Sequence, residues 1–197
     1  MCRPCRVLFY CDLCGFTALG DSLGGQELVE LLNDYLACMA EPVEARGGQV
    51  LKFMGGGMLG MFELSPVGGA KTRGEISVAA LEAALDALAR ISQLNEKRRA
   101  SQQSTMALNV TLHLGDVAYG NIGSPMRLDF TVIGPAVNEV SRLEGMCDPL
   151  ERRLLISKAF ADAIPEGGPS LLPLSRHGLR NVREPLHLFT VEQVPEP

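Results

Sequence analysis

The sequence predicts an α+β protein whose helices cover one mostly antiparallel sheet. The chain has 197 residues, which is enough for one domain with a hydrophobic core and short for two. Hydrophobic residues make up 46% and charged residues 21%, a balance typical of folded proteins. Strand-like and helix-like patterns follow one another in a mixed order, not in a regular strand–helix alternation. We therefore expect a single domain over residues 1–197, with its core at about 5–194.

The first predicted strand delivers an acidic side chain to its end. Arg6–Cys11 is a short apolar run that stops at Asp12, as a buried strand followed by a turn does. A helix over 26–46 follows, because apolar residues recur there at helical spacing and the glycine pair 47–48 ends the run. Its predicted inward-facing residues are Leu28, Leu31, Leu32, Tyr35, Leu36, Met39 and Val43.

Glycine marks the next predicted element, which is a hairpin. Strands over 49–53 and 58–62 flank the triple glycine Gly55–Gly57, and such a turn needs positive φ angles. After a surface loop over 65–74, an Ala- and Leu-rich helix is predicted over 75–97. A polar stretch then ends this helix.

The second half of the chain is expected to contain a second hairpin. Apolar residues alternate with polar or small residues over 106–114 and 117–122, on the two sides of Gly115 and Asp116. The remaining predicted elements are a helix over 134–146, a strand over 154–157, a short helix over 158–164, a loop over 165–169 and a closing strand over 186–194.

Charge and hydropathy exclude several classes of function. The formal net charge is −5, which argues against a nucleic-acid partner because neutralising phosphates needs a basic face. No run of about 18 apolar residues occurs, and the N-terminus lacks the apolar stretch of a signal peptide. We therefore expect a cytoplasmic protein with no membrane segment in this chain. A triphosphate that carries its own metal ion is compatible with the charge.

The six cysteines are expected to be reduced thiols. Cys2-x-x-Cys5 and Cys11-x-x-Cys14 together imitate a four-thiolate zinc site. Only five residues separate the two pairs, however, whereas zinc ribbons place about a dozen or more between them. Cys11 and Cys14 are therefore expected to fill space beside Asp12.

Six separately spaced segments resemble the class III adenylate and guanylate cyclases. They occur in the order of that family and span nearly the whole chain, which makes the match far more specific than a lone glycine motif. The segments are Val7–Thr17, Leu31–Tyr35, Gly48–Gly55, Gly115–Gly123, Asp129–Asn138 and Ser141–Glu144. The resemblance implies a ferredoxin-like αβ sandwich core with added C-terminal elements, and a head-to-tail dimer whose sites lie between subunits. It also implies attack of the ribose 3′-hydroxyl of ATP on the α-phosphate, which yields 3′,5′-cyclic AMP and pyrophosphate.

The resemblance further implies a site for two divalent metal ions, Mg²⁺ or Mn²⁺. One ion can lower the pKa of the attacking hydroxyl while the other stabilises the triphosphate charge. Asp12 matches the first of two metal-binding carboxylates of the family, and the backbone carbonyl of Leu13 matches the usual backbone ligand. Gly15, Phe16 and Thr17 would offer backbone N–H groups to the phosphates, as loops entering a helix commonly do.

The second metal-binding carboxylate of the family is missing. The family pattern is Lys-Phe-x-Gly-Asp-Gly, and this chain reads Lys-Phe-Met-Gly-Gly-Gly over 52–57. Gly56 therefore stands where the aspartate belongs. One carboxylate holds two hard cations poorly against the repulsion between them, so we expect weak binding of a second ion and weak autonomous activity.

The residues that contact the nucleotide in the family are matched. Lys52 matches the lysine that contacts the purine, and Thr131 falls at the companion position, where many bacterial adenylate cyclases carry threonine. ATP is therefore favoured over GTP. Asn138 matches the asparagine that orients the ribose, and Arg142, one helical turn later, matches the arginine that stabilises charge on the α-phosphate. Arg180 takes the place of a phosphate-binding lysine, and a guanidinium can also bind a phosphate.

Two functions remain open. The first is an adenylate cyclase that uses magnesium or manganese and works as a homodimer. The second is a catalytically impaired subunit or nucleotide-binding module, which forms a heterodimer and donates its base and transition-state residues to a partner cyclase domain that supplies the aspartates. A diguanylate cyclase-like domain is disfavoured, because the Gly-Gly-Asp/Glu-Glu-Phe signature is absent.

Taken singly, the same residues have ordinary structural interpretations. Asp12 would be a cap or turn residue, Lys52 a solvated strand residue, and Asn138 with Arg142 an exposed polar pair on a helix. Only their joint spacing favours a site. The histidines are interpreted as structural, because nothing nearby completes a Cys/His/Asp site. They are His113, His177 and His187.

Overall fold

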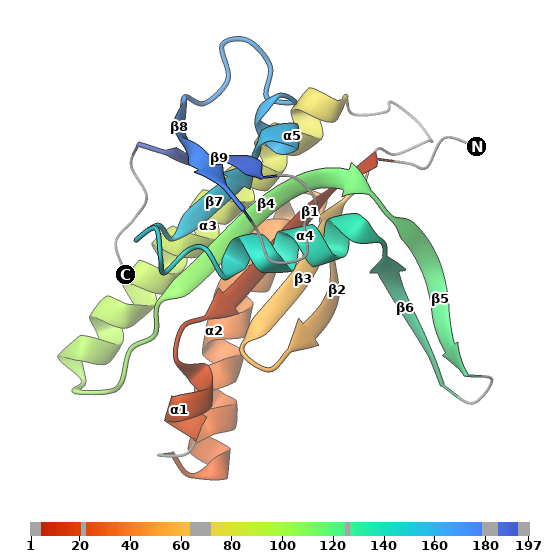
Figure 1. Ribbon diagram of the computed structural model, residues 1–197. Coiled ribbons are helices and arrows are strands. Elements are labelled where there is room, and N and C mark those ends of the chain that lie inside the picture. The colour runs from red at the N-terminus through yellow and green to blue at the C-terminus, as the bar shows by residue number, and fades with distance from the viewer. Residues whose placement is uncertain (1–4, 21–22, 64–71, 125–126, 179–184, 193–197) are drawn as a thin grey trace.

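A seven-stranded sheet forms the centre of the computed structural model, which describes residues 5–20, 23–63, 72–124, 127–178 and 185–192. The strand order is β2-β3-β1-β4-β7-β9-β8 (Figure 1). Only the β4–β7 pair is parallel among these neighbours. The strands are β1 (Cys5–Leu13), β2 (Gln49–Met54), β3 (Gly57–Phe62), β4 (Leu108–Asp116), β7 (Leu154–Ser157), β8 (Leu171–His177) and β9 (Leu186–Val191). The predicted α+β class with one mostly antiparallel sheet is confirmed.

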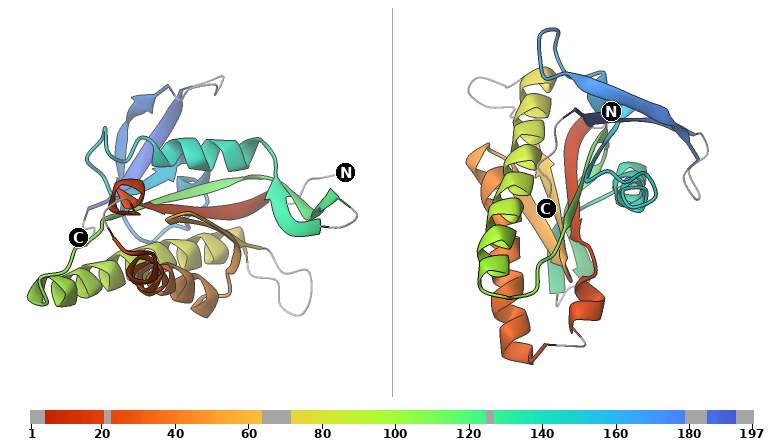
Figure 2. Two further views of the ribbon diagram at one scale, coloured as in Figure 1. Left: turned by 90° about the horizontal axis from the view of Figure 1, so that it is seen from below. Right: turned by 90° about the vertical axis from the view of Figure 1, so that its left-hand side faces the viewer.

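Helices cover both faces of this sheet (Figure 2). The long helices α2 (Gly25–Ala45) and α3 (Arg73–Ala100) lie on one face, and α4 (Pro135–Glu144) lies on the other. Two short helices, α1 (Phe16–Gly20) and α5 (Lys158–Ala161), follow the ends of β1 and β7. Among the described residues, none of these helices has a stretch that is apolar and long enough to cross a bilayer.

Alternation along β1 sends side chains into two different cores. Val7, Phe9 and Cys11 are fully buried in the larger hydrophobic cluster, which α2 and α3 cover. Leu8 and Tyr10 point the other way, toward α4 and a smaller cluster. Each large apolar side chain contributes about 1.5–3 kcal/mol when it is fully buried. The larger cluster therefore dominates the stabilisation of the sheet, and the α4 face can accommodate polar residues.

The first half of the chain follows the prediction closely. The helix predicted over 26–46 is α2, which buries Leu31, Tyr35, Met39 and Val43. The predicted glycine hairpin is β2 and β3, and its turn contains Gly55 at a φ of 61°. This φ lies in the left-handed region that glycine adopts without steric cost. The short helix α1 was not predicted.

Helix α3 is longer than predicted at both ends. Thr72 and Glu75 form a capping box, in which Thr72 N–H donates to Glu75 Oε2 at 2.6 Å and Glu75 N–H donates to Thr72 Oγ1 at 3.2 Å. The helix continues past the predicted end at residue 97, because Arg98 is buried and its Nε donates to the Ser104 carbonyl oxygen at 2.7 Å. Most of the loop predicted to precede this helix lies outside the described residues.

The prediction of the second hairpin was wrong in its pairing. Strand β4 pairs with β1 and β7 in the main sheet, whereas β5 (Ala118–Ser124) pairs with β6 (Arg127–Ile133). These two form a separate ribbon that extends from the body of the protein (Figure 1). The side chains of β4 are buried on both faces from Leu108 to Leu114, as in a central strand with a neighbour on each side.

The C-terminal part adds two further differences. The strand predicted over 154–157 is β7, but the helix after it ends at Ala161, not at 164. Strand β8 was not predicted, because Pro173 interrupts its pattern; proline is tolerated in a strand at the edge of a sheet, which is where β8 lies. The closing strand β9 ends at Val191, and residues 193–194 lie outside the described part of the chain.

Candidate active site

A pocket of about 740 Å³ opens where β1 ends. Its walls are the ends of β1 and β4, the turn between β2 and β3, the start of α1 and the C-terminal end of α4. Five of the predicted site residues line it, and these are Asp12, Leu13, Gly15, Phe16 and Gly56. The structure thus brings together the predicted metal and phosphate positions from two segments of the chain that lie about 40 residues apart.

Strand pairing positions Asp12 in this pocket. Asp12 is paired with Gly57 of β3 on one side and with Asn109 of β4 on the other. A Cβ atom at Gly57 would lie 2.7 Å from Asp12 Oδ1, a distance that real Cβ contacts do not show. Glycine at position 57 therefore leaves the space that the Asp12 carboxylate occupies.

The carboxylate of Asp12 is electrostatically unfavourable in the absence of a cation. Partial burial, and after it the negative charge of Glu144, raises the pKa of Asp12 from 3.8 to about 6, although a hydrogen bond from the Leu13 backbone acts in the opposite direction. A bound cation would relieve both unfavourable contributions. The position is therefore chemically suited to a divalent ion.

Gly56 lies directly beside the Asp12–Leu13 peptide. The backbone N–H of Leu13 donates to the carbonyl oxygen of Gly56 at 3.2 Å. A Cβ atom at Gly56 would lie 2.9 Å from both Cβ and Cγ of Phe16. At the position where the second metal carboxylate is expected, the structure therefore has an aromatic side chain packed against a glycine.

The donor groups of this pocket do not fit a two-ion centre. Among the described residues, no group of three His, Cys, Asp or Glu side chains is arranged to hold a metal ion. Glu144 and Asp148 also line the pocket, but Glu144 Oε1 accepts from Asn109 Nδ2 at 3.0 Å and Asp148 Oδ1 accepts from Arg153 Nη1 at 3.1 Å. Asp12 and the Leu13 carbonyl remain as ligands for one ion at most.

Sequence reasoning gave no role to Asn109, Glu144, Asp148 and Arg153. Arg153 Nη1 also donates to Asn109 Oδ1 at 2.8 Å, so the four side chains form one polar network beside Asp12. The only local signal was the alternation of polar residues along the segment that became β4. Which strand that segment joins depends on a pairing across about 100 residues, and local patterns do not encode it.

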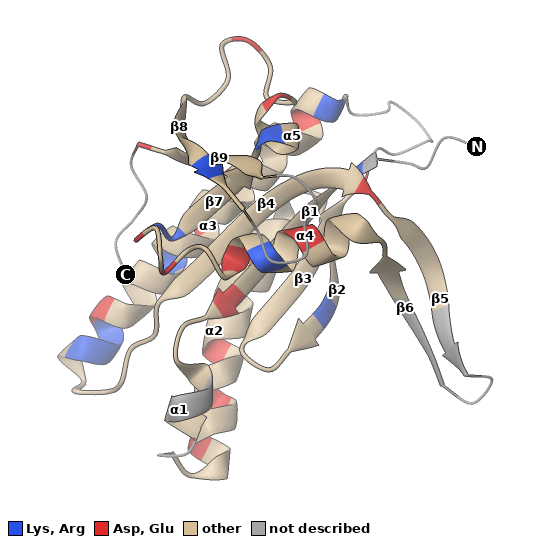
Figure 3. Ribbon diagram, viewed as in Figure 1, with Lys and Arg blue, Asp and Glu red and all other residues tan. Residues whose placement is uncertain are grey.

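The predicted base, ribose and transition-state residues lie elsewhere. Lys52 on β2 and Asn138 on α4 are exposed, while Thr131 on β6 and Arg142 on α4 are half-buried. None of these four lines the pocket of Asp12. Figure 3 shows basic positions on both β2 and α4.

The elements that carry these four residues share one core. Leu51, Val132 and Val137, which are chain neighbours of Lys52, Thr131 and Asn138, all belong to or pack against the smaller hydrophobic cluster. Common packing fixes β2, β6 and α4 relative to one another. The predicted site residues thus fall into two separate groups, one at Asp12 and one spread over β2, β6 and α4.

Two predicted residues cannot be placed in full. Thr17 lies in α1, but its side chain is outside the described part of the chain. Arg180 lies outside the described residues altogether. Their predicted roles toward phosphate stay predictions.

The two described thiols beside Asp12 contact different partners. Cys11 is buried, its Sγ donates to Met39 Sδ at 3.2 Å, and burial raises the pKa of this thiol. Cys14 lines the pocket, and its Sγ accepts from Arg153 Nη1 at 3.2 Å. Cys11, Cys14, Cys38 and Cys147 are free. Cys2, which the zinc alternative requires, lies outside the described residues.

His113 has two polar side-chain neighbours that the sequence did not reveal. His113 Nδ1 lies 2.9 Å from Ser157 Oγ, and His113 Nε2 lies 3.2 Å from Glu139 Oε2. These neighbours come from segments that lie 26 and 44 residues further along the chain, so no local pattern could reveal them. His177 Nε2 pairs with Ser175 Oγ at 2.8 Å, and His187 is exposed.

Comparison with known sequences gives a consistent result. Residues 3–164 match the family model described as "Adenylate and Guanylate cyclase catalytic domain". An adenylate cyclase of Anabaena cylindrica is 29% identical over 157 residues, which is 78% of this chain and 29% of that protein. Adenylate cyclase 1 of Rhizobium meliloti is 31% identical over 137 residues, which is 70% of this chain and 20% of that protein. The chain thus spans less than a third of the length of either relative.

Solved structures share the fold. A bacterial light-regulated adenylyl cyclase is 25% identical and superposes with a TM-score of 0.82 over 98% of this chain and 53% of that one. The adenylyl cyclase CyaB from P. aeruginosa is 24% identical and superposes with a TM-score of 0.85 over 100% of this chain and 98% of that one.

Proposed function

The chain belongs to the family of adenylate and guanylate cyclase catalytic domains, and on that premise we propose that it works as one subunit of a dimer that converts ATP to cyclic AMP. In this proposal the chain donates its base, ribose and transition-state residues to a site whose metal-binding aspartates come from the partner subunit. The proposal is made for this domain alone, because its match covers only 29% and 20% of the two relatives.

One observation carries the choice of a complementing subunit over a self-sufficient enzyme. Gly56 adjoins the Asp12–Leu13 peptide at the place of the second carboxylate, and Phe16 fills the space that a side chain there would need. A carboxylate cannot be added at this position without moving Phe16. The nucleotide-contacting positions, in contrast, carry residues able to do the chemistry.

The reaction transfers the α-phosphorus between two oxygens. The ribose 3′-hydroxyl loses its proton to solvent and its oxygen forms a bond to the α-phosphorus, while the bond from that phosphorus to the bridging oxygen breaks and pyrophosphate leaves. Lys52 can donate to a ring nitrogen of adenine, which accepts, with Thr131 beside the same base. Asn138 would orient the ribose. Arg142 would face the charge that develops on the α-phosphate.

Helix geometry supports the pairing of the last two residues. Asn138 and Arg142 are four residues apart on α4, so their side chains leave the helix on neighbouring turns of one side. A ribose and its α-phosphate are also neighbours within one nucleotide, so two side chains on adjacent helical turns can contact both. A divalent ion held by the partner's aspartates would supply charge stabilisation at the triphosphate.

A second candidate function is slow autonomous turnover by the homodimer. The retained Asp12, with its raised pKa and its partly open pocket, favours it because this carboxylate gains from binding a cation. The two candidate functions differ in whether a partner cyclase domain raises the activity.

Mixing experiments separate these candidates. The purified chain is assayed for cyclic AMP from ATP with Mn²⁺, alone and mixed with a cyclase domain that keeps both aspartates but has its transition-state arginine replaced by alanine. The complementing role predicts little product from either protein alone and a maximum near an equimolar mixture. Activity that is proportional to this chain alone, with no gain on mixing, would support autonomous turnover and contradict the complementing role.

A further inference from the structure

Three alternate residues of β4 each make a polar contact with α4. All three side chains point to the α4 face of the sheet, and together their contacts run from Glu139 to Glu144, the last residue of the helix. The contacts are Asn109 Nδ2 to Glu144 Oε1 at 3.0 Å, Thr111 Oγ1 to the Val140 carbonyl oxygen at 3.1 Å, and His113 Nε2 to Glu139 Oε2 at 3.2 Å. We refer to these three contacts as the β4–α4 ladder.

The burial of the ladder makes its polarity informative. Asn109, Thr111 and His113 are 2%, 0% and 5% exposed, and a buried polar group without a partner costs free energy that an apolar residue would not. Apolar packing also holds α4 on the sheet, but the hydrophobic effect that drives it is non-directional. Hydrogen bonds require defined distances and angles. The ladder therefore specifies one setting of the helix.

The first and last contacts of the β4–α4 ladder hold two different sides of α4. Each residue of a helix turns the chain by about 100°, so Glu139 and Glu144, five residues apart, point about 140° from each other. The buried stripe of Ala136, Val140 and Leu143 lies between them. Rotation of α4 in either direction would lengthen one of the two contacts.

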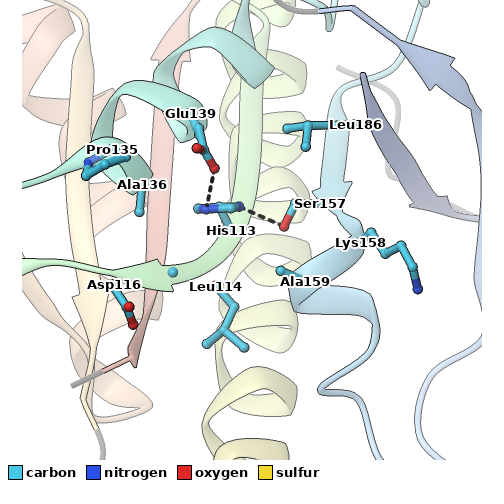
Figure 4. A pocket seen from close by; sticks show the side chains of 11 residues that line it. His113, Leu114, Asp116, Pro135, Ala136, Glu139, Ser157, Lys158, Ala159 and Leu186 are labelled. Carbon is cyan, nitrogen blue, oxygen red and sulfur yellow. Dashed lines mark hydrogen bonds and ion pairs between the residues drawn. The ribbon is translucent and has the colours of Figure 1, made fainter. Parts of the chain in front are cut away.

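His113 also connects the β4–α4 ladder to the neighbouring strand β7 (Figure 4). Its Nδ1 lies 2.9 Å from Ser157 Oγ at the end of β7, and the same oxygen accepts from Phe160 N–H at 3.3 Å. When the Ser157 hydroxyl donates to Nδ1, the other ring nitrogen carries the proton that Glu139 accepts. The hydrogen bond from His113 lowers the pKa of Glu139, so the acceptor is a carboxylate at neutral pH.

The start of α4 borders a pocket on the side of His113. The pocket has a volume of about 480 Å³, and Figure 4 shows Pro135 and Ala136 on one side of it with Leu186 and Ala159 across from them. His113 lies between these two sides. The contacts of His113 therefore add to the packing of the buried Ala136 at this end of the helix.

We propose that His113 is a positioning residue, which through Glu139 sets the rotation of α4 and thereby the placement of Asn138 and Arg142. The inference rests on the proposed function, because Asn138 and Arg142 have their catalytic roles only in that proposal. Glu139 adjoins Asn138 and lies three residues before Arg142 on the same helix. A misplacement of about 1 Å at a reacting centre can cost about 100-fold in rate, so a small rotation of α4 matters.

The test compares variants of Glu139 and His113 with a control on the same helix. Glu139→Ala and His113→Leu break the contact from its two sides, Glu139→Gln keeps an oxygen that can accept from His113 Nε2, and Ser141→Ala changes an exposed residue of α4. In the equimolar mixture described above, we expect Glu139→Ala and His113→Leu to lower kcat by about 10-fold or more. KM for ATP should stay within about twofold, because the base contacts lie on β2 and β6. Glu139→Gln and Ser141→Ala should stay close to the unsubstituted chain.

Amide hydrogen exchange on the chain alone provides a second readout that does not depend on turnover. Glu139→Ala should speed the exchange of α4 amides by about 10-fold, while the amides of β1 and α2 keep their rates. Unchanged α4 exchange, or kcat and KM changing together with protection lost throughout the chain, would overturn the positioning role. If the unsubstituted mixture makes no cyclic AMP, the proposed function fails, and with it the role of His113 in placing Asn138 and Arg142 for catalysis. The exchange result still decides whether the ladder holds α4.

Discussion

The side chain of Phe16 lies where a side chain at Gly56 would have to begin, since a Cβ atom built on Gly56 would be 2.9 Å from both Cβ and Cγ of Phe16. The conflict involves the first carbon of the aromatic side chain, so turning the ring does not remove it. The chain must shift at α1 or at the β2–β3 turn to admit any larger residue. The pocket is therefore adapted to glycine at this position.

The first prediction concerns stability. We expect Gly56→Ala to lower the free energy of unfolding by about 1–3 kcal/mol, because overpacking a close contact displaces its neighbours. Gly120→Ala is the matched control, since a Cβ there would meet nothing within 4 Å. Urea unfolding followed by circular dichroism measures both. An equal, small effect of the two substitutions would show that Phe16 moves aside without lowering the free energy of unfolding.

The second prediction concerns autonomous activity. Gly56→Asp should raise cyclic AMP production by the homodimer by about 100-fold or more, because a second carboxylate restores several kcal/mol of charge stabilisation through the metal. Gly56→Asn is the control of equal size, and it should stay near the unsubstituted rate despite the same displacement of Phe16. Equal rates for the two variants would show that the missing carboxylate charge does not limit autonomous activity.

The sequence could predict this conflict only in part. The glycine at position 56 is visible in the chain, and the helix and hairpin around it follow from local spacing and turn chemistry. That Phe16 packs against Gly56 depends on how β1 pairs with β3 across about 50 residues. Local patterns do not contain that pairing.

The same limit explains the wrong hairpin and the missed network. The segment that became β4 alternates like a hairpin strand, but its partners β1 and β7 lie far away in the sequence. Once β4 joins β1, Asn109 comes opposite Asp12 and His113 comes under Glu139. The residues that are predicted to carry the chemistry, such as Asp12 and Arg142, could be selected by motif. The residues that support them could not.

The third prediction concerns pH. Folding raises the pKa of Asp12 from 3.8 to about 6, so the folded state favours the neutral acid. Its stabilising contribution is complete below pH 3.8 and is lost as the pH rises through 6. For a fully buried group, a pKa rise of this size would change the free energy of unfolding by about 3 kcal/mol. Solvent screening of the half-buried Asp12 reduces the expected change to about 1 kcal/mol.

Asp12→Asn, which cannot ionise, measures this contribution. With a chelator present, the variant should be more stable than the unsubstituted chain at pH 7 by about 1 kcal/mol, and the difference should shrink as the pH approaches 4. Urea midpoints across this range give the comparison. A difference that does not vary with pH would contradict the raised pKa.

The fourth prediction concerns the base. In the Gly56→Asp background, Lys52→Glu together with Thr131→Cys should shift the preference from ATP toward GTP. A lysine donates to the acceptors of adenine, whereas a carboxylate accepts from the N1 and N2 protons of guanine. The ratio of kcat/KM for the two nucleotides is the measurement. An unchanged ratio would remove Lys52 and Thr131 from the base-reading site.

The last prediction concerns the division of labour within the dimer. Asp12 lies in its own pocket, and Arg142 lies on α4 outside that pocket, so a site shared between subunits draws on only one of them from this chain. In the mixed dimer, one site combines the partner's two aspartates with Asn138 and Arg142. The opposite site has Asp12 without a second carboxylate and faces the partner's disabled arginine position. Only the first site can turn over.

Two substitutions in this chain should therefore have unequal effects on the mixture. Arg142→Ala should abolish cyclic AMP formation, because the charge that develops on the α-phosphate then has no guanidinium opposite it. Asp12→Ala should leave the rate within about twofold, since the carboxylate it removes belongs to the silent site, and a single pocket substitution of this kind need not disturb α4. Cross-linking or light scattering must show that both variants still form the mixed dimer. Equal loss of activity in two variants that dimerise equally would mean that the two residues serve one and the same site, and the complementing role would have to be abandoned.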